Sequence, residues 1–326
     1  MKRVLITGAA GSIGSALLEK LVQQQDVTIC AYDHNEDALF RLSRRFNNIP
    51  TIRFFLGDIR DNRRLNQAFA KVDTVFHCAA LKHVGLNEYN PMETIRTNII
   101  GTENVIEAAI SSSVRTFIYT SSDKAVNPSN TMGASKLLGE KICIAANNLS
   151  GQNGARFCCV RFGNVIGTNG SVVPIFRDQL SNRNPLTITD PSMTRYFISS
   201  DEAVNLCLLA AKEVVGGEIF IRNMGSAKIG QLAQVLANGE PYQVNIIGRL
   251  PGEKNYEELM TIEESFRSLV YNNLLVVLPE QSHIPPSISL GLSAKYGSTL
   301  GISRHLRSDL DIMDDKCLKS LLHEFI

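Results

Sequence analysis

The chain has 326 residues, of which 44% are hydrophobic and 20% are charged, and its formal net charge is +1. This is an ordinary globular composition, and the near-neutral charge gives no sign of a nucleic-acid or membrane-surface partner. The length allows roughly three quarters of the unfolded chain's surface to be buried, in a larger domain with a smaller lobe. Glycines interrupt the short apolar run near the start, and no stretch approaches the roughly 18 apolar residues of a membrane span. We therefore expect a soluble, cytoplasmic protein.

Seven cysteines are present, and none belongs to a CxxC pair. An odd number without metal-ligand spacing indicates reduced thiols in a reducing compartment. We expect no metal site.

The first 160 residues alternate short apolar runs with amphipathic segments. We expect strands over Val4–Ile6, Val27–Tyr32, Ile52–Leu56, Thr74–Cys78, Thr116–Thr120 and Phe157–Arg161. We expect helices over Ser12–Gln24, Glu36–Phe46, Pro91–Ser111 and Met132–Asn148. Continuous apolar strands that alternate with helices are typical of a parallel sheet covered on both faces. The sequence thus predicts a Rossmann-type, doubly wound α/β fold.

Beyond about residue 165, proline and glycine become frequent and the predicted elements shorten. We expect a helix over Val173–Leu180, a turn over Pro251–Lys254 and a loop near Pro285. We therefore divide the chain into a dinucleotide-binding domain, residues 1–165, and a mixed substrate-binding lobe, residues 166–326. Some crossing of the chain between the two is expected.

Gly8, Gly11 and Gly14 form a GxxGxxG pattern that directly follows the first strand and opens the first helix. In that context, glycines permit a tight turn and a close approach of the backbone to a pyrophosphate at the helix N-terminus. The pattern predicts a dinucleotide site.

Asp33 ends the second predicted strand, and a carboxylate there suits the two ribose hydroxyls of NAD and repels a 2′-phosphate. We therefore favour NAD over NADP, although His34, Arg41 and Arg44 weaken the preference. Asp58, after the third strand, is expected at the adenine edge. The alternative is a plain glycine turn with a capping aspartate.

Five segments carry a resemblance to a known family: Ala79–Val84, Ser122–Pro128, Met132–Lys136, Arg161–Val165 and Thr194–Phe197. Over roughly residues 2 to 260 the chain resembles the extended short-chain dehydrogenase/reductases. Within them, it is most similar to the UDP-N-acetylglucosamine 4,6-dehydratases of bacterial polysaccharide biosynthesis.

The resemblance implies a hydro-lyase that makes a UDP-4-keto-6-deoxy sugar for glycan synthesis by internal hydride transfer from C4 to C6. NAD is reduced and reoxidised within one turnover, so the reaction needs no external reductant. The resemblance also implies retention of configuration at C5. It implies a homodimer or higher oligomer formed through helices 91–111 and 132–148.

Asp123 and Lys124 follow the fifth strand, at the carboxyl edge of the predicted sheet, where ligands bind in such folds. Removal of water needs a base for the C5 hydrogen and an acid for the departing 6-hydroxyl, and this pair provides both. Lys124 acts as a base only when neutral. We therefore expect burial or nearby positive charge, from Lys136 or oxidised nicotinamide, to lower its pKa. The alternative is an ordinary surface ion pair.

Related enzymes carry YxxxK, whereas this chain has methionine at position 132 and lysine at 136. Methionine cannot transfer a proton. The C4 hydroxyl proton would then pass to Asp123, Ser122 or Lys124, and Lys136 would hold the cofactor. We predict a catalytic set of Asp123, Lys124, Ser122 and Lys136.

The remaining site residues follow the resemblance. Those expected to bind the cofactor are Gly8, Gly11, Ser12, Ile13, Gly14, Asp33, His34, Asp58, Ile59, Ala79, Ala80, Lys82, Asn98 and Lys136. Those expected to bind the UDP-sugar are Lys82, His83, Asn164, Val173, Arg195, Arg249 and Glu253. Arg249 is displaced by one residue from the family's GLRPGEK pattern, which puts its role in doubt.

Two other functions fit part of the pattern. A nucleotide-sugar 4-epimerase needs the same hydride site but no acid–base pair for loss of water. A non-catalytic NAD-binding scaffold would explain Met132, but it leaves Asp123, Lys124 and Lys136 without a purpose.

Overall fold

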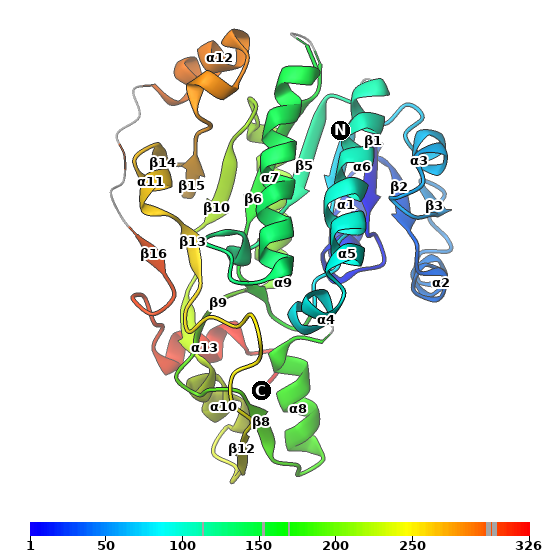
Figure 1. The fold of residues 1–326 in the computed structure, drawn as a ribbon. Coiled ribbons are helices and arrows are strands. Elements are labelled where there is room, and N and C mark those ends of the chain that lie inside the picture. The colour runs from blue at the N-terminus through cyan, green and yellow to red at the C-terminus, as the bar shows by residue number, and fades with distance from the viewer. Residues whose placement is uncertain (113, 152–153, 169, 298–300, 302–304) are drawn as a thin grey trace.

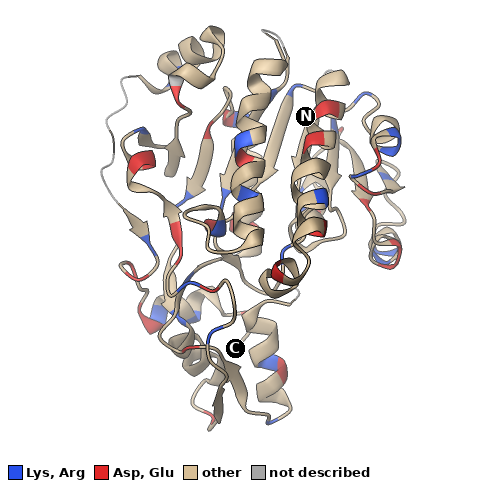
Figure 2. Cartoon of the chain, viewed as in Figure 1, with Lys and Arg blue, Asp and Glu red and all other residues tan. Residues whose placement is uncertain are grey.

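The computed structural model describes residues 1–112, 114–151, 154–168, 170–297, 301 and 305–326. Within them, one large sheet and its helices form the upper part of the molecule in Figure 1, and a smaller lobe lies below. Basic and acidic side chains are interspersed over the elements of both parts (Figure 2). That pattern agrees with the near-zero net charge.

Nine strands of the described chain form the large sheet, and from one edge its order begins β3-β2-β1-β4-β5-β6. Its strands are β1 Arg3–Thr7, β2 Thr28–Asp33, β3 Ile52–Leu56, β4 Thr74–His77, β5 Thr116–Thr120, β6 Arg156–Arg161, β10 Ile219–Arg222, β14 Ser268–Tyr271 and β15 Leu274–Val277. The pairs from β3 to β10 are parallel, whereas β15 and β14 add antiparallel pairs at the far edge. This order confirms the expected Rossmann-type fold. The strand order reverses at β1, so a crevice forms between the loops that follow β1 and β4.

Helices cover both faces of this sheet. They are α1 Ser12–Val22, α2 Glu36–Arg45, α3 Asn62–Ala68, α4 Val84–Tyr89, α5 Pro91–Thr94, α6 Gly101–Ser111, α7 Thr131–Leu149 and α9 Ser200–Glu213. Helix α1 packs beside α9, while α6 packs against both α3 and α7. The strands between them are almost fully buried; Val4, Leu5 and Ile6 of β1, for example, are 0% exposed. Buried strands of this kind explain why the sequence shows continuous apolar runs there.

The helix expected over Pro91–Ser111 is helical throughout, but its middle third is a π-helix, η1, Ile95–Ile100. Asn98 lies in this segment, with its amide braced against the backbone of Leu81. The expected loop near Pro285 is instead the start of α12, Pro286–Tyr296. Proline fits the first turn of a helix because its missing N–H has no partner there in any case.

The smaller lobe has its own apolar core, centred on Phe176, Leu186, Phe197 and Leu232. Its elements are β7 Asn164–Val165, α8 Val172–Ser181, β8 Leu186–Ile188, β9 Thr194–Ile198, β11 Ser226–Lys228, α10 Ile229–Ala237, β12 Val244–Ile246 and α13 Asp315–Leu321. The remaining short elements are β13 Glu258–Met260, α11 Ile262–Ser265, η3 Gln281–His283 and β16 Leu306–Arg307. Strands β10, β14 and β15 lie after residue 165 yet join the large sheet, so this sheet draws on both halves of the sequence.

A buried ionic cluster joins these parts. Arg161, at the end of β6, donates to Glu140 of α7 at 2.7 and 2.6 Å and to Glu264 of α11 at 2.7 and 2.8 Å. The Arg161 side chain is 2% exposed. Glu264 also caps α11 through Thr261. The guanidinium thus fixes α11, and the β13 segment before it, against the core of the sheet.

This cluster generates a stability prediction. We expect Glu140→Gln to lower the free energy of unfolding by about 1.5–3 kcal/mol, because it replaces a two-oxygen, charge-assisted contact with the buried guanidinium by an amide whose N–H group cannot accept from it. Urea denaturation measures the loss. The matched control is Glu107→Gln on the exposed side of α6, which should stay within about 0.5 kcal/mol of the wild type. A loss below about 1 kcal/mol in the Glu140 variant, as for a surface ion pair, would contradict this account.

Candidate functional site

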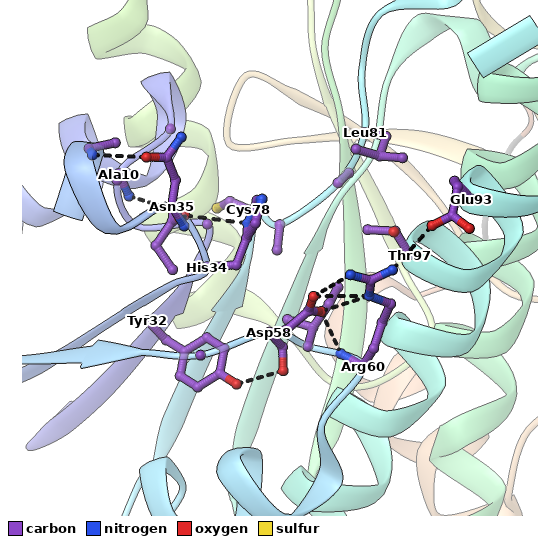
Figure 3. A pocket seen from close by; sticks show the side chains of 18 residues that line it. Ala10, Tyr32, His34, Asn35, Asp58, Arg60, Cys78, Leu81, Glu93 and Thr97 are labelled. Carbon is purple, nitrogen blue, oxygen red and sulfur yellow. Dashed lines mark hydrogen bonds and ion pairs between the residues drawn. The ribbon is translucent and has the colours of Figure 1, made fainter. Parts of the chain in front are cut away.

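A cavity of about 480 Å³ lies at the carboxyl edge of the sheet. Residues that follow β1, β2, β3 and β4 form most of its wall (Figure 3). Eight predicted cofactor residues line it: Gly8, Gly11, Asp33, His34, Asp58, Ile59, Ala79 and Ala80. This is the crevice expected at the point where the strand order reverses, and its walls come from the loops predicted to hold a dinucleotide.

The glycine-rich turn has the geometry that such a ligand needs. Gly8 has a φ of +67°, and a Cβ added there would lie 2.7 Å from the backbone nitrogen of Ala79. A Cβ on Gly14 would lie 2.2 Å from the carbonyl oxygen of Gly8. Both positions therefore require glycine, since a side chain would push the turn off the neighbouring loop or the helix. Gly11 caps the N-terminus of α1 and faces the cavity, where the free N–H groups of a helix favour an anion.

Asp33 is held at the cavity wall by two backbone amides. Its carboxylate accepts hydrogen bonds from Ala10 N and Asn35 N, both at 2.9 Å. A carboxylate held in this way, with each oxygen keeping further acceptor capacity, is suited to ribose hydroxyls. His34 next to it is largely exposed, and its Nδ1 lies 3.6 Å from the carboxylate.

Asp58 does not stand free at the adenine edge, because Arg60 clamps it. The Arg60 guanidinium contacts both Asp58 oxygens at distances down to 2.6 Å and reaches Glu93 at 3.2 Å. Hydrogen bonding from Arg60 lowers the pKa of Asp58. Figure 3 shows this cluster, with the Tyr32 hydroxyl donating to the Asp58 carbonyl beside it. A clamped carboxylate presents a fixed acceptor to the cavity.

The predicted catalytic pair lies beyond the next strand, at the same edge of the sheet. Asp123 and Lys124 form the 3-10 turn η2, Asp123–Ala125, directly after β5. Lys124 Nζ lies 3.0 Å from Asp123 Oδ1, and Ser122 Oγ donates to the same oxygen at 2.7 Å. Asp123 is 0% exposed. Its Oδ2 is also buried and accepts no hydrogen bond from any residue that the structure describes.

Two further side chains complete the surroundings of the Lys124 amine. Asn164 of β7 accepts a hydrogen bond from Nζ at 3.1 Å, and Glu257 Oε1 lies 4.0 Å away. Glu257 is 3% exposed, and its Oε2 lies 3.1 Å from Lys254 Nζ. Glu257 and Lys254 were not predicted as site residues, because they are more than a hundred residues from η2 in the chain and reach it only through the fold.

These contacts overturn the expected charge of Lys124. Burial alone would lower the pKa of its amine, but the carboxylates of Asp123 and Glu257 outweigh burial and raise the pKa above its ordinary value. Lys136 does not supply the expected positive charge; Arg195 is the cation that acts on Lys124 and lowers its pKa in part. The Lys124 side chain is therefore protonated at neutral pH, and the prediction that its pKa is lowered is wrong.

Lys136 and Met132 lie on the first turns of α7. Lys136 is 7% exposed; its Nζ donates to the carbonyl of Thr120 at 2.9 Å and lies 4.9 Å from the centre of the Tyr119 ring. Burial lowers the pKa of Lys136 to about 8. Met132 is 4% exposed and occupies the tyrosine position of the YxxxK pattern.

The other predicted cofactor and substrate residues lie in different settings. Asn98 is fully occupied, since its amide bonds the backbone of Leu81 and the hydroxyl of Ser135. Ser12, Ile13 and Gly14 form the first turn of α1 and do not line the cavity. Lys82 and His83 are exposed after β4.

In the smaller lobe, Val173 is 1% exposed in the apolar core. Arg195 is buried, and its guanidinium donates to the carbonyl of Thr194 at 2.8 Å. Arg249 is exposed, with Asp190 at 3.9 Å, and Glu253 accepts from Leu250 N in its own turn. The roles assigned to these residues stay predictions.

The cavity also has walls that the sequence did not indicate: Ala10, Tyr32, Asn35, Ala38, Gly57, Arg60, Cys78, Leu81, Glu93 and Thr97. Most of these neighbour a predicted residue along the chain. Glu93 and Thr97 come from a helix at the far side, and no local pattern marks them.

A family model described as "Polysaccharide biosynthesis protein" matches residues 4–279. The chain therefore belongs to this family, as its motifs predict. A relative from Campylobacter jejuni, named UDP-N-acetylglucosamine 4,6-dehydratase (inverting), is 40% identical over 90% of this chain and 87% of its own. One from Rickettsia canadensis, named UDP-glucose 4-epimerase, is 38% identical over 81% and 79%. These relatives place the chain among the nucleotide-sugar dehydratases and epimerases.

A third relative, from Methanocaldococcus jannaschii, is described as an uncharacterized membrane protein and is 45% identical over 85% of this chain and 86% of its own. No helix in the described part of the present chain is long and apolar enough to cross a membrane. Among solved structures, Pen from Bacillus thuringiensis matches with a TM-score of 0.89 at 35% identity, over 99% of this chain and 97% of Pen. A Thermus thermophilus UDP-glucose 4-epimerase solved with NAD has the same fold, with a TM-score of 0.67 at 24% identity, over 78% and 88%.

The cavity generates a binding prediction. Gly11 has an extended backbone (φ −76°) that any residue adopts, and an added Cβ would lie 3.2 Å from the carbonyl oxygen of Gly8, so the turn must shift only slightly. Gly11→Val should therefore fold while its side chain fills the space where a pyrophosphate would approach. We expect the affinity for NAD to fall by about tenfold or more, about 1.4 kcal/mol, in a calorimetric titration. Gly85→Val is the matched control, because a Cβ there meets none of the described heavy atoms within 4 Å. Unchanged NAD affinity in the Gly11 variant would contradict the assignment.

Proposed function

We propose that the protein is a nucleotide-sugar 4,6-dehydratase that converts UDP-N-acetylglucosamine to a UDP-4-keto-6-deoxy sugar for glycan synthesis. The observation that carries this is the buried Asp123–Lys124 pair, one oxygen of which has no partner among the described residues. A buried carboxylate oxygen without a hydrogen bond is costly, so a ligand hydroxyl that binds it gains free energy. The names of the Campylobacter relatives support the same reaction.

NAD is the cofactor of this proposal. The helix N-terminus at Gly11, the braced carboxylate of Asp33 and the cavity between them fit its pyrophosphate and adenosine ribose. Lys136 lies on the path toward the catalytic pair, and its buried amine suits the nicotinamide ribose. When bound, NAD supplies a hydride acceptor for C4 and a hydride donor for C6.

The pair contributes an acid and a base to the elimination between C5 and C6. As folded, the proton lies on Lys124, and Asp123 is its carboxylate partner at 3.0 Å. Transfer of that proton to Asp123 leaves the total charge of the pair unchanged and gives a neutral amine beside a protonated carboxyl. The amine then takes the C5 hydrogen, and the carboxyl gives its proton to the departing 6-hydroxyl. The raised pKa of Lys124 thus describes the resting pair and is compatible with its role as the base.

The proton of the C4 hydroxyl needs a path that avoids Met132. Ser122 Oγ, Asp123 Oδ1 and Lys124 Nζ form a continuous hydrogen-bonded chain. A proton released at C4 can pass to Ser122, which is only partly buried, and from there to solvent, so that the pair keeps the single proton that the elimination uses. Asn164 orients the Lys124 amine, and Arg195 adds positive charge where a diphosphate would bind.

The second candidate is a nucleotide-sugar 4-epimerase, which the printed name of the Rickettsia relative favours. That reaction needs hydride transfer at C4 alone, so it gives no purpose to a buried acid and base beside C5 and C6. A non-catalytic scaffold explains Met132 but not the buried charges. A cytoplasmic location and assembly through the helices of residues 91–111 and 132–148 stay predictions.

The reaction itself tests the proposal. Incubation with UDP-N-acetylglucosamine and NAD in deuterated water should give a product lighter by one water that carries deuterium at C5, because the base exchanges its proton with solvent. Mass spectrometry and NMR measure both. The same reaction in ordinary water is the unlabelled control. A product of unchanged mass with inverted C4 would favour the epimerase, and absence of turnover would favour the scaffold.

The same NMR spectrum reports the configuration at C5. The resemblance implied retention, whereas the two Campylobacter relatives are named as inverting enzymes. We adopt inversion for this chain, since those names come from relatives that match most of its length.

A variant separates the base from cofactor binding. We expect Lys124→Ala to reduce the rate of water loss by about 10²–10⁴-fold, the usual contribution of general base catalysis, with NAD affinity unchanged. The matched control is Lys141→Ala, which removes an exposed lysine from α7. Wild-type turnover in the Lys124 variant would remove the assignment of the base.

A further inference from the structure

Glu257 is a buried carboxylate in the catalytic cluster that the proposed reaction does not use. It comes from the segment before β13, far along the chain from Lys124, and is 3% exposed. Its two oxygens lie 4.0 Å from Lys124 Nζ and 3.1 Å from Lys254 Nζ. Glu257 Oε2 accepts no aligned hydrogen bond from the described residues, so its contact with Lys254 is an ion pair.

We propose that Glu257 is a positioning residue that keeps the proton shared by Asp123 and Lys124 within the pair, so that the pair still holds its acid proton as the pH rises above neutrality. This inference rests on the dehydratase proposed above.

The charge of Glu257 makes loss of the shared proton unfavourable. If the pair lost its proton, a neutral Lys124 would stand between two buried carboxylates, Asp123 and Glu257. Like charges in a low-dielectric site repel strongly, so this state is disfavoured and the proton stays. Without Glu257, the neutral amine beside Asp123 alone would form at lower pH. The pair would then lose the proton that serves as the acid at a lower pH.

The other charged groups around Lys124 do not replace Glu257. Arg195 of β9 acts in the opposite direction, and Lys254 neutralises part of the Glu257 charge. Asn164 is uncharged. Glu258, next in the chain, turns away to the side chains of Asn127 and His305.

The same segment holds Glu257 in place over the catalytic turn. Lys254 Nζ donates to the carbonyl of Val126 at 3.0 Å, and Ser129 and Asn130 both donate to the carbonyl of Gly252 at 2.9 Å. These contacts tie the lobe to the loop that follows η2. The carboxylate therefore reaches Lys124 only when the lobe is folded against the large sheet.

The test is a titration of Lys124 that needs no substrate. Competitive acetylation across pH, read by mass spectrometry of the peptide that contains Lys124, gives the midpoint for this amine in the full chain. We expect Glu257→Gln to shift the midpoint to lower pH by about 1–3 units, the usual effect of a charge at this distance. Glu258→Gln is the matched control and should titrate with the wild type. In turnover with UDP-N-acetylglucosamine, the loss of activity at high pH should move in the same direction for Glu257→Gln.

Glu257→Asp keeps the charge but withdraws it by one methylene, so it should shift the midpoint less and in the same direction. If Glu257→Gln does not fold, this variant decides. A midpoint equal to that of the wild type, or an equal shift in Glu258→Gln, would overturn the inference. A wild-type protein that removes no water would contradict the proposed function, whereas water loss without any shift of the midpoint would contradict this inference alone.

Discussion

A partly buried lysine between two buried carboxylates is the interaction on which the site depends. Lys124 has Asp123 on one side and Glu257 on the other. Their negative charges stabilise the positive charge of the amine, which burial alone would disfavour. Asp123 comes from the large sheet and Glu257 from the segment that precedes β13. The site is therefore complete only when both parts of the chain are in place. Arg161 stabilises that arrangement, because it pairs with Glu140 of α7 and with Glu264 of α11, which follows β13.

The parallel sheet explains why the cofactor cavity and this ion pair are neighbours. Strands β4 and β5 are adjacent and parallel, so the loops that follow them emerge at the same edge. The loop after β4 lines the cavity, and the turn after β5 carries the pair. A ligand that extends from the cavity along this edge reaches the pair after one strand spacing. The small lobe supplies Asn164 and Arg195 from the opposite side.

Much of this could be predicted from the sequence where the signal is local. The glycine turn, Asp33 and the strand–helix alternation all follow from short patterns, and the structure confirms the fold and the family. The pairing of Asp123 and Lys124 follows from their adjacency in the chain. What failed was the charge of Lys124: the adjacent Asp123 carboxylate raises the pKa of the amine most, and Glu257, a contact across more than a hundred residues, raises it further. The Arg60 clamp on Asp58 spans only two residues, but no backbone pattern indicates a side-chain contact of this kind. Glu93 and Thr97 reach the cavity only through the packing of their helix. The strand edge formed by β14 and β15 was missed because the sequence pattern beyond residue 260 is weak.

The central claim is that the carboxyl of residue 123 and the amine of residue 124 reach the sugar together. A crystal structure of the Lys124→Ala variant with NAD and UDP-N-acetylglucosamine tests it most directly, since the substrate should bind without being consumed. We predict the 6-hydroxyl within hydrogen-bonding distance, about 3 Å, of Asp123 Oδ2, with the C5 hydrogen directed at the space left by the amine. A sugar ring bound away from η2, with Asp123 Oδ2 still without a partner, would contradict the account.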